Sequence, residues 1–115
     1  MGIKIQDPNT TYELAHPSGA VFVMGHWTCA MQDEADKQCL SVDSKGNVSF
    51  DISKDREIKA RLSVRDWRGV ENGDGTEVAC TEENKRRLPP GVLLWLVREI
   101  DERAGLRIRE EEKKN

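Results

Sequence analysis

The sequence predicts an α+β fold, in which a small N-terminal antiparallel β-hairpin or sheet is followed by a mainly helical remainder. Before residue 25, apolar residues first alternate with polar ones, and a short apolar run, Ala20–Met24, then follows a Pro-Ser-Gly turn at residues 17–19. Further on, the helix-start residues Thr28 and Thr81 precede segments with helical apolar spacing. For 115 residues we expect a single domain over residues 1–106, followed by a charged flexible tail over residues 107–115.

The composition argues against two classes of partner. Charged residues make up 34% of the chain, the formal net charge is −3, and no basic block is present, so nucleic acid is not an expected partner. The longest apolar run, Val92–Val97, is far too short to span a membrane. The N-terminal segment MGIKIQD also lacks the apolar core of a signal peptide, so we expect no membrane partner.

The first elements follow from local patterns. We expect a hairpin of Thr11–Ala15 with Ala20–Met24, with Ile3–Gln6 as a possible third strand. Thr28 is a suitable N-cap for a surface helix over about Cys29–Leu40. The weakly apolar face of that helix consists of Met31, Ala35 and Cys39.

Residues 41–47 are expected to form a loop, and the segment after them is ambiguous. Alternation of apolar and polar residues between Ile58 and Val64 favours a strand. The many strong helix formers favour a helix instead, and Ala60, Val64 and Trp67 would share one face of that helix. The glycine of the segment WRGV stands where a helix would end on a residue with positive φ. We therefore expect a helix over about Lys54–Arg68, closed by Gly69.

The segment ENGDGTE, residues 71–77, contains two turn dipeptides, Asn-Gly and Asp-Gly, and is interpreted as a small turn or hairpin. An EF-hand calcium loop with Gly75 at its sixth position would begin at Val70 and end at Thr81, where Asp and Glu are required. The Gly-Lys-Ser/Thr of a phosphate loop is also missing. This loop therefore predicts neither a bound ion nor a cofactor.

No catalytic group of residues emerges from the sequence. His16 and His26 lie in no nucleophile motif, and the three cysteines form no C-x-x-C pair, as expected of reduced thiols in the cytosol. His26, Cys29 and Cys39 could share a metal site, but small half-buried cysteines are the preferred interpretation. We therefore expect no catalytic, cofactor-binding or metal-binding residues and no enzyme activity.

The last part of the chain predicts two helices. Thr81 can cap a short helix with two acidic residues in its first turn. The Pro-Pro pair at residues 89–90 ends that helix and begins the last one, which is expected to run to about Arg103 with Gly105 as its terminator. The expected core face of the last helix consists of Leu93, Leu96, Val97, Ile100 and Ala104.

Trp95 does not belong to that core face, because helical geometry places it nearly opposite, among charged residues. A Trp beside an Arg on a polar face is typical of an interface anchor, but a loop could also cover it. The two interpretations, a partner-binding surface and local cover, are equally supported. The candidate partner-binding residues are Leu94, Trp95, Arg98 and Glu102. The residues with expected structural roles are Trp67, Gly69, Thr81, Leu93, Leu96, Val97 and Ile100.

The order of these features resembles the small tail assembly chaperones of long-tailed, siphovirus-like phages. Those proteins open with a strand pair around a Pro-x-Gly-like turn, here YELAHPSGAVFVM, followed by a helical middle and a W-x-G-V segment, here residues 67–70. An Asp-Gly turn at 74–75, a helix start at 81–84, a Leu-Pro break and a final helix follow in the same order. The resemblance covers about residues 12–100, and residues 39–55 match nothing in it.

This resemblance implies a non-enzymatic α+β protein of the host cytoplasm that self-associates. It also implies binding to the tape-measure protein and the tail-tube protein during virion morphogenesis, and it would give Trp95 a role. An alternative in the same setting is a structural virion protein, such as a head–tail connector or tail completion protein. The two differ in whether the protein remains in the finished particle.

Overall fold

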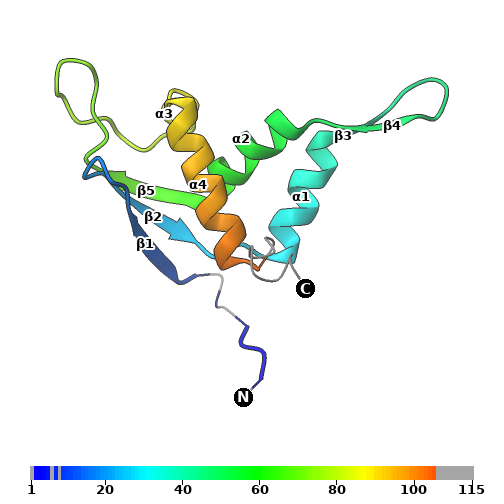
Figure 1. Cartoon of the computed structure of the whole chain (residues 1–115), viewed down its shortest axis with the longest axis horizontal. Helices are drawn as coiled ribbons and strands as arrows, with labels where there is room; N and C mark the ends of the chain where they lie inside the picture. Colours follow the sequence, from blue (N-terminus) through cyan, green and yellow to red (C-terminus); the bar gives the residue numbers. More distant parts are fainter. Residues whose placement is uncertain (1, 6, 8, 106–115) are drawn as a thin grey trace, which may run out of the picture.

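The computed structural model describes residues 2–5, 7 and 9–105, and the predicted tail lies outside them. The predicted α+β class is confirmed: an antiparallel three-stranded sheet in the order β1-β2-β5 packs with helices (Figure 1). The strands are β1 (Thr11–Ala15), β2 (Val21–Gly25) and β5 (Val64–Arg68). The single domain over residues 1–106 stays a prediction.

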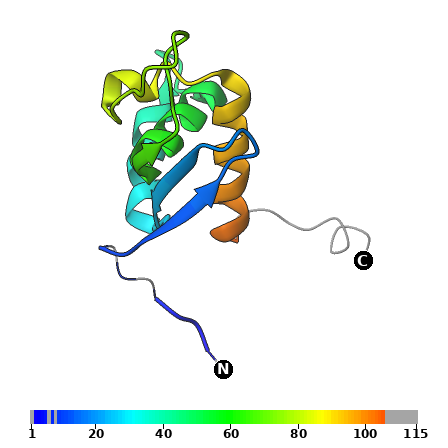
Figure 2. The same ribbon diagram turned by 90° about the vertical axis from the view of Figure 1, so that its left-hand side faces the viewer.

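The first hairpin agrees with the prediction to within one residue, but its third strand does not. The outer edge of β2 pairs with β5 rather than with the N-terminal segment. Ile3 and Ile5 are 98% and 95% exposed, and Figure 2 shows this segment leading away from the sheet. β5 is the better neighbour for β2 because it adds two large side chains, Val64 and Trp67, to the same core.

The predicted helix over Lys54–Arg68 is correct only in its first part. Helix α2 spans Ile52–Ser63, and the chain then continues directly as β5. Asp51 caps α2, because its Oδ1 accepts a hydrogen bond from the backbone N–H of Lys54 at 3.0 Å. Trp67 therefore lies on a strand and not at the end of a helix.

A β-bulge explains why the pattern of β5 resembled a helix. Val64 and Trp67 are both buried, although residues three apart in a regular strand point to opposite faces. Met24 of β2 pairs with Val64, whereas the residue before Met24 pairs with Asp66, so Arg65 is an extra residue. The bulge thus reproduces the three-residue spacing of a helix face.

Gly69 has the positive φ that the sequence predicts, +79°, but it follows a strand instead of a helix. A Cβ at this position would lie 3.1 Å from the Cα of Ala20 in the first hairpin. The backbone N–H of Gly69 donates a hydrogen bond to Oε1 of Glu77 at 2.9 Å. Glycine is therefore needed here both for the turn out of the sheet and for close backbone packing.

Helix α1 (Cys29–Cys39) begins where predicted, and the hydroxyl of its N-cap Thr28 accepts a hydrogen bond from a first-turn N–H at 3.3 Å. Two residues of its apolar face, Ala35 and Cys39, are buried against Ile58 of α2. The third predicted residue of this face, Met31, is half-buried. The pattern therefore identified the face that α1 packs against α2.

The predicted loop at residues 41–47 is instead part of a second hairpin. Strand β3 (Leu40–Val42) pairs with β4 (Val48–Phe50), separately from the main sheet. Asp43 closes the turn, because its Oδ1 accepts a hydrogen bond from the backbone N–H of Asn47 at 2.9 Å. Figure 1 shows this hairpin extending away from the helices.

The turn predicted for residues 71–77 is confirmed. The N–H of Asn72 donates to the carbonyl of Thr76 at 2.8 Å, and an isolated bridge joins the residues on either side. The indole Nε1 of Trp67 donates to the carbonyl of Val78 at 2.6 Å. This hydrogen bond fixes the returning chain to the sheet, which makes the segment structural.

The two C-terminal helices form as predicted. Thr81 caps α3 (Glu82–Lys85), and its hydroxyl accepts a hydrogen bond from the N–H of Asn84 at 3.1 Å. Helix α4 (Pro90–Arg103) starts at the second proline and ends before Gly105, which has a φ of +72°. Its position beside the sheet is set by the core residues described next.

The core consists of two hydrophobic clusters. The first lies between the sheet and α4, the second lies between α1 and α2, and Trp27 packs against both. The first comprises Leu14, Ala20, Phe22, Met24, Val64, Trp67, Leu96 and Ile100, and the second Ala35, Cys39 and Ile58. Helix α2 contacts both α1 and α4, so it joins the two clusters.

Candidate protein-interaction surfaces

Helix α4 presents an exposed stripe formed by Leu94, Arg98 and Glu102, which follow one another at four-residue intervals. We refer to these three residues as the α4 stripe. Leu94 is 47% exposed, and within the described residues Arg98 and Glu102 make no ion pair or side-chain hydrogen bond. Three of the four predicted partner-binding residues therefore share one surface.

Trp95, the fourth predicted partner-binding residue, is half-buried and packs on the first core cluster. Its ring meets that of His16 edge-on with a centroid distance of 4.8 Å, and its centroid lies 6.3 Å from that of Phe22. Trp95 therefore does not lie on the exposed polar face of α4, contrary to what was expected from helical geometry. Of the two interpretations, these contacts favour a Trp95 that is covered by other parts of the same chain. An edge-on aromatic contact such as the one to His16 stabilises the fold.

Trp95 is covered because α4 packs on two neighbours and buries a wide arc. On one side Trp95 and Leu96 face the sheet, and on the other Asp101 reaches Nζ of Lys59 in α2 at 2.8 Å. At 3.6 residues per turn, the arc from Trp95 to Asp101 covers about 240° of the helix. A surface helix with one neighbour typically buries a stripe of roughly 100°.

The predicted core face of α4 is otherwise mostly correct. Leu96, Val97 and Ile100 are buried, and Leu93 is half-buried. Ala104 is exposed, contrary to the prediction, because it lies just beyond the last residue of the helix. The residues that hold α4 in place were therefore visible in the sequence, except for Trp95 and Asp101.

Lys59 of α2 is 6% exposed and lies between two carboxylates. Its Nζ is 2.8 Å from Asp101 and 3.8 Å from Asp55, and it lies 5.6 Å from the ring centroid of Trp27. Burial raises the pKa of Asp55, since the cost of desolvating this carboxylate outweighs the attraction of Lys59. This group of charges links α2 to α4 and has a structural role.

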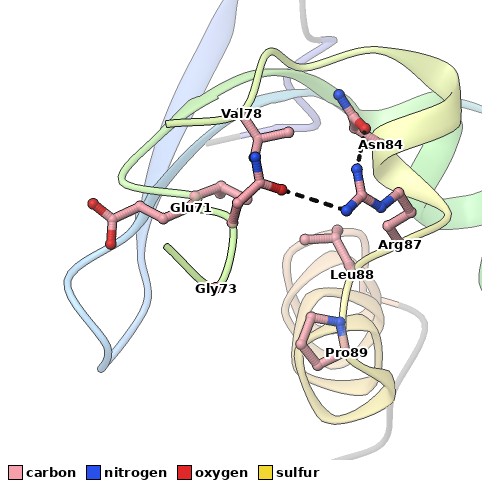
Figure 3. A pocket seen from close by; sticks show the side chains of 9 residues that line it. Glu71, Gly73, Val78, Asn84, Arg87, Leu88 and Pro89 are labelled. Atoms are coloured by element: carbon pink, nitrogen blue, oxygen red, sulfur yellow. Dashed lines mark hydrogen bonds between the residues drawn. The ribbon is translucent and has the colours of Figure 1, made fainter. Parts of the chain in front are cut away.

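A shallow hollow of about 210 Å³ lies between the 71–77 turn and the start of α4 (Figure 3). The guanidinium of Arg87 donates hydrogen bonds to the side-chain oxygens of Asn84 at 3.2 Å and Asn72 at 3.4 Å. Val78 and Leu88 form its apolar wall. Sequence reasoning did not identify this hollow, because its wall combines residues from two separate loops.

A second hollow of about 170 Å³ adjoins the first and extends to the turn between β1 and β2. At its edge the hydroxyl of Ser18 lies 2.7 Å from Nδ1 of His16, and the backbone N–H of Ser18 donates to the same nitrogen at 3.1 Å. Residues this close in sequence make such contacts within a turn. The two hollows together form a shallow, mostly apolar depression with polar groups at its rim.

The β3–β4 hairpin carries the largest group of exposed apolar side chains. Leu40 pairs with Phe50 and Val42 with Val48, so period-two geometry places all four on one face. Their exposed fractions are 48%, 42%, 66% and 65%, in that order. We call these four residues the hairpin face. Sequence reasoning missed it, although alternating apolar residues around the Asp-Ser-Lys-Gly-Asn turn were a usable signal.

Cys39 is buried and Cys80 is half-buried, and both are free thiols. Burial raises the pKa of Cys39 and of Cys80, which disfavours their thiolate forms. In residues 2–5, 7 and 9–105, no group of three or more His, Cys, Asp or Glu side chains is placed to hold a metal ion. His26, Cys29 and Cys39 do not form such a group either.

Comparison with known proteins adds no identification. The chain matches no family model, no curated protein and no solved structure. Every helix in the described segments is too short or too polar to cross a bilayer. The features that bear on function are therefore the surfaces themselves and the order of motifs along the chain.

Proposed function

We propose that this protein is a non-enzymatic tail assembly chaperone, acting in the host cytoplasm, that binds the tape-measure protein and aids assembly of the tail tube. The observation that carries the proposal is the α4 stripe. It places an aliphatic, a cationic and an anionic side chain in line over about two turns of a firmly packed helix. A second helix can pack along such a line, with Leu94 as its apolar contact.

The residues behind the resemblance support the same proposal. Trp67, Gly69 and Thr81 are all structural: they hold the sheet, the turn after it and the start of α3 in one arrangement. The motifs shared with the resembled family thus stabilise the fold and carry no reactive group. Such motifs are consistent with a protein whose function is to bind other proteins. Self-association and contact with the tail-tube protein belong to the proposal as well.

Co-expression with the tape-measure protein of the same phage tests this function. The wild-type chain should co-purify with the tape-measure protein, whereas the double variant Leu94→Asp, Arg98→Glu should no longer co-purify with it. The matched control is Lys37→Glu, which changes an exposed charge on the last turn of α1, away from the α4 stripe. Far-UV circular dichroism should show all three proteins equally folded.

Mass spectrometry of purified virions separates the chaperone from a structural virion protein. A chaperone should be missing from finished particles although it is abundant in infected cells. Stoichiometric amounts of the chain in particles would support a connector or tail completion protein instead. If the wild type and the α4 double variant bind the tape-measure protein equally well, the α4 stripe is not the binding surface.

A further inference from the structure

The turn at residues 71–77 contains two glycine dipeptides that look alike in the sequence but differ in the structure. In the first, Asn72-Gly73, both residues are exposed, and in the part of the chain that the structure describes the backbone N–H of Gly73 donates no hydrogen bond. In the second, Asp74-Gly75, the N–H of Gly75 donates to the carbonyl of Asn72 at 2.9 Å. Of the two dipeptides, only Asn72-Gly73 therefore has a free backbone nitrogen directly after a carbonyl-bearing side chain.

A free nitrogen in this position is a nucleophile for the side chain before it. The backbone nitrogen of one residue and Cγ of a preceding asparagine can close a small imide ring, which makes asparagine one of the thermolabile residues of proteins. Because both groups belong to one chain, the attack is unimolecular. A side chain on the attacking residue crowds the ring, and glycine has none. An exposed Asn-Gly pair with a free glycine N–H is therefore a reactive pair.

We propose that Asn72 is a site of spontaneous deamidation, in which Gly73 supplies the nucleophile and Arg87 polarises the amide. Hydroxide removes the proton of the Gly73 N–H, and the nitrogen bonds to Cγ of Asn72. The bond from Cγ to Nδ2 then breaks, and Nδ2 leaves as ammonia after taking a proton from water. Water opens the imide either at Cγ, which leaves an aspartate at position 72, or at the backbone carbonyl carbon, which leaves an isoaspartate. The net reaction consumes water and releases ammonia.

Arg87 supports this reaction from the wall of the first hollow (Figure 3). Its guanidinium donates to Oδ1 of Asn72 at 3.4 Å, and this oxygen gains negative charge when the nitrogen of Gly73 attacks Cγ. The other side-chain acceptor of this guanidinium is also neutral, Oδ1 of Asn84 at 3.2 Å, and among the described residues Arg87 makes no ion pair. No carboxylate therefore neutralises the positive charge that acts on the amide of Asn72.

Asn84 is an internal comparison, because the same guanidinium contacts its amide oxygen. The next backbone N–H, that of Lys85, donates to the carbonyl of Thr81 at 2.9 Å within α3, so this nitrogen is held away from the side chain. Asn47 is followed by Val48, whose branched side chain crowds the ring closure. Both asparagines should therefore react much more slowly than Asn72.

Deamidation changes the rim of the first hollow. The aspartate product sets a carboxylate against the guanidinium of Arg87, so a neutral hydrogen bond becomes an ion pair between the 71–77 turn and the segment after α3. The isoaspartate product lengthens the main chain by a methylene at the point where the N–H of Asn72 donates to the carbonyl of Thr76 at 2.8 Å, which loosens the turn. The reaction is independent of tape-measure binding, because none of its groups belongs to the α4 stripe.

Ageing of the purified full-length chain in mildly alkaline buffer made with heavy-oxygen water tests the proposal. Peptide mapping by mass spectrometry should find the labelled carboxylate at position 72 before any other asparagine, at a rate that rises with pH because hydroxide removes the Gly73 proton. Gly73→Ala should slow the labelling at least about tenfold. This variant should keep the fold, since a Cβ on Gly73 meets nothing within 4 Å and Gly73 is not a glycine of positive φ.

Two further variants test the part of Arg87, and circular dichroism checks that each is folded. Arg87→Gln should slow the labelling several-fold. Asn72→Asp, which reproduces the first product, should raise the thermal midpoint by about 2 °C, and either added salt or Arg87→Gln should abolish that rise. Labelling of Asn84 as fast as Asn72, or of Gly73→Ala as fast as the wild type, would overturn the site. Unchanged or faster labelling of Arg87→Gln would overturn the assistance by Arg87.

Discussion

Trp95 and Leu94 are neighbours in sequence that face different environments. Trp95 packs on His16 and Phe22, whereas Leu94 is 47% exposed on the α4 stripe. Trp95→Ala should therefore lower the free energy of unfolding by about 2–3 kcal/mol, somewhat less than a fully buried Trp would. Leu94→Ala should change it by no more than about 0.5 kcal/mol. Thermal or urea unfolding of the two variants measures both values.

For tape-measure binding, the substitution of Leu94 should have the larger effect, whereas for stability the substitution of Trp95 has the larger effect. Leu94→Ala should weaken tape-measure binding although it leaves the fold intact, because Leu94 is the apolar residue of the α4 stripe. Phe is the matched control at position 95, since Trp95→Phe keeps a ring on Phe22 and should recover much of the lost stability. Equal destabilisation by Trp95→Ala and Leu94→Ala would show that Trp95 is not packed as described.

At this scale the sequence predicted most of the candidate site. The shared stripe of Leu94, Arg98 and Glu102 follows directly from helical spacing, which depends only on local geometry. The position of Trp95 depends on how many neighbours α4 has, and that is decided by residues far away in the chain. Asp101 was missed for the same reason, because its partner Lys59 lies on another helix.

Among the elements, the turn after β5 depends on one glycine more than on any other residue. Gly69 has a φ of +79° and would bring a Cβ to 3.1 Å from the Cα of Ala20. Gly75 has a similar φ of +86° but open space around it. Gly75→Ala should cost about 1 kcal/mol for the left-handed backbone, and Gly69→Ala about 2–3 kcal/mol because a backbone clash is added.

The two glycine variants control for each other, because they share the backbone strain and differ in the contact with Ala20. Their difference in unfolding free energy, measured by urea denaturation, isolates that contact. Trp67 fluorescence should also shift in Gly69→Ala, since the strand that carries Trp67 would move away from the first hairpin. Equal effects at the two positions would mean that the chain adjusts without strain.

The helices whose ends are marked by capping residues, proline or glycine were predicted well. Thr28, Thr81, the Pro-Pro pair and Gly105 mark ends through local hydrogen bonds and backbone limits, and the structure uses all of them. β5 was missed because Gly69 was interpreted as the end of a helix, although its positive φ ends a strand. The bulge added to the error, since it places Val64 and Trp67 on one face at helical spacing. The β3–β4 hairpin was missed although its apolar residues alternate around a turn, because strands of three residues give only a short periodic signal.

At the scale of the whole molecule, α2 joins two clusters that the sequence treats as separate patterns. Its buried residues include Ile58 in the second cluster, and Lys59 beside it reaches Asp101 of α4. Trp27 packs against both clusters, and its Nε1 donates to Oε1 of Gln32 in α1 at 3.0 Å. Because α2 and Trp27 contact both clusters, unfolding of one cluster should also disrupt the packing of the other.

This linkage predicts that the described body of the protein unfolds as one cooperative unit. Leu96→Ala in the first cluster and Ile58→Ala in the second should each cost about 2–5 kcal/mol. In both variants the urea transitions followed by tryptophan fluorescence and by far-UV circular dichroism should coincide. The fluorescence reports mainly on the first cluster, where Trp67 and Trp95 pack, so Ile58→Ala is the decisive variant.

Val42→Ala is the control for that experiment, because it removes a similar apolar group from the exposed hairpin face. Because Val42 is 66% exposed, this substitution should change the unfolding free energy by no more than about 0.5 kcal/mol. If Ile58→Ala lowers the circular-dichroism midpoint but leaves the fluorescence midpoint unchanged, the two clusters unfold separately. The Lys59–Asp101 pair would then be a contact between two independent units, and α2 would not transmit stability from one to the other.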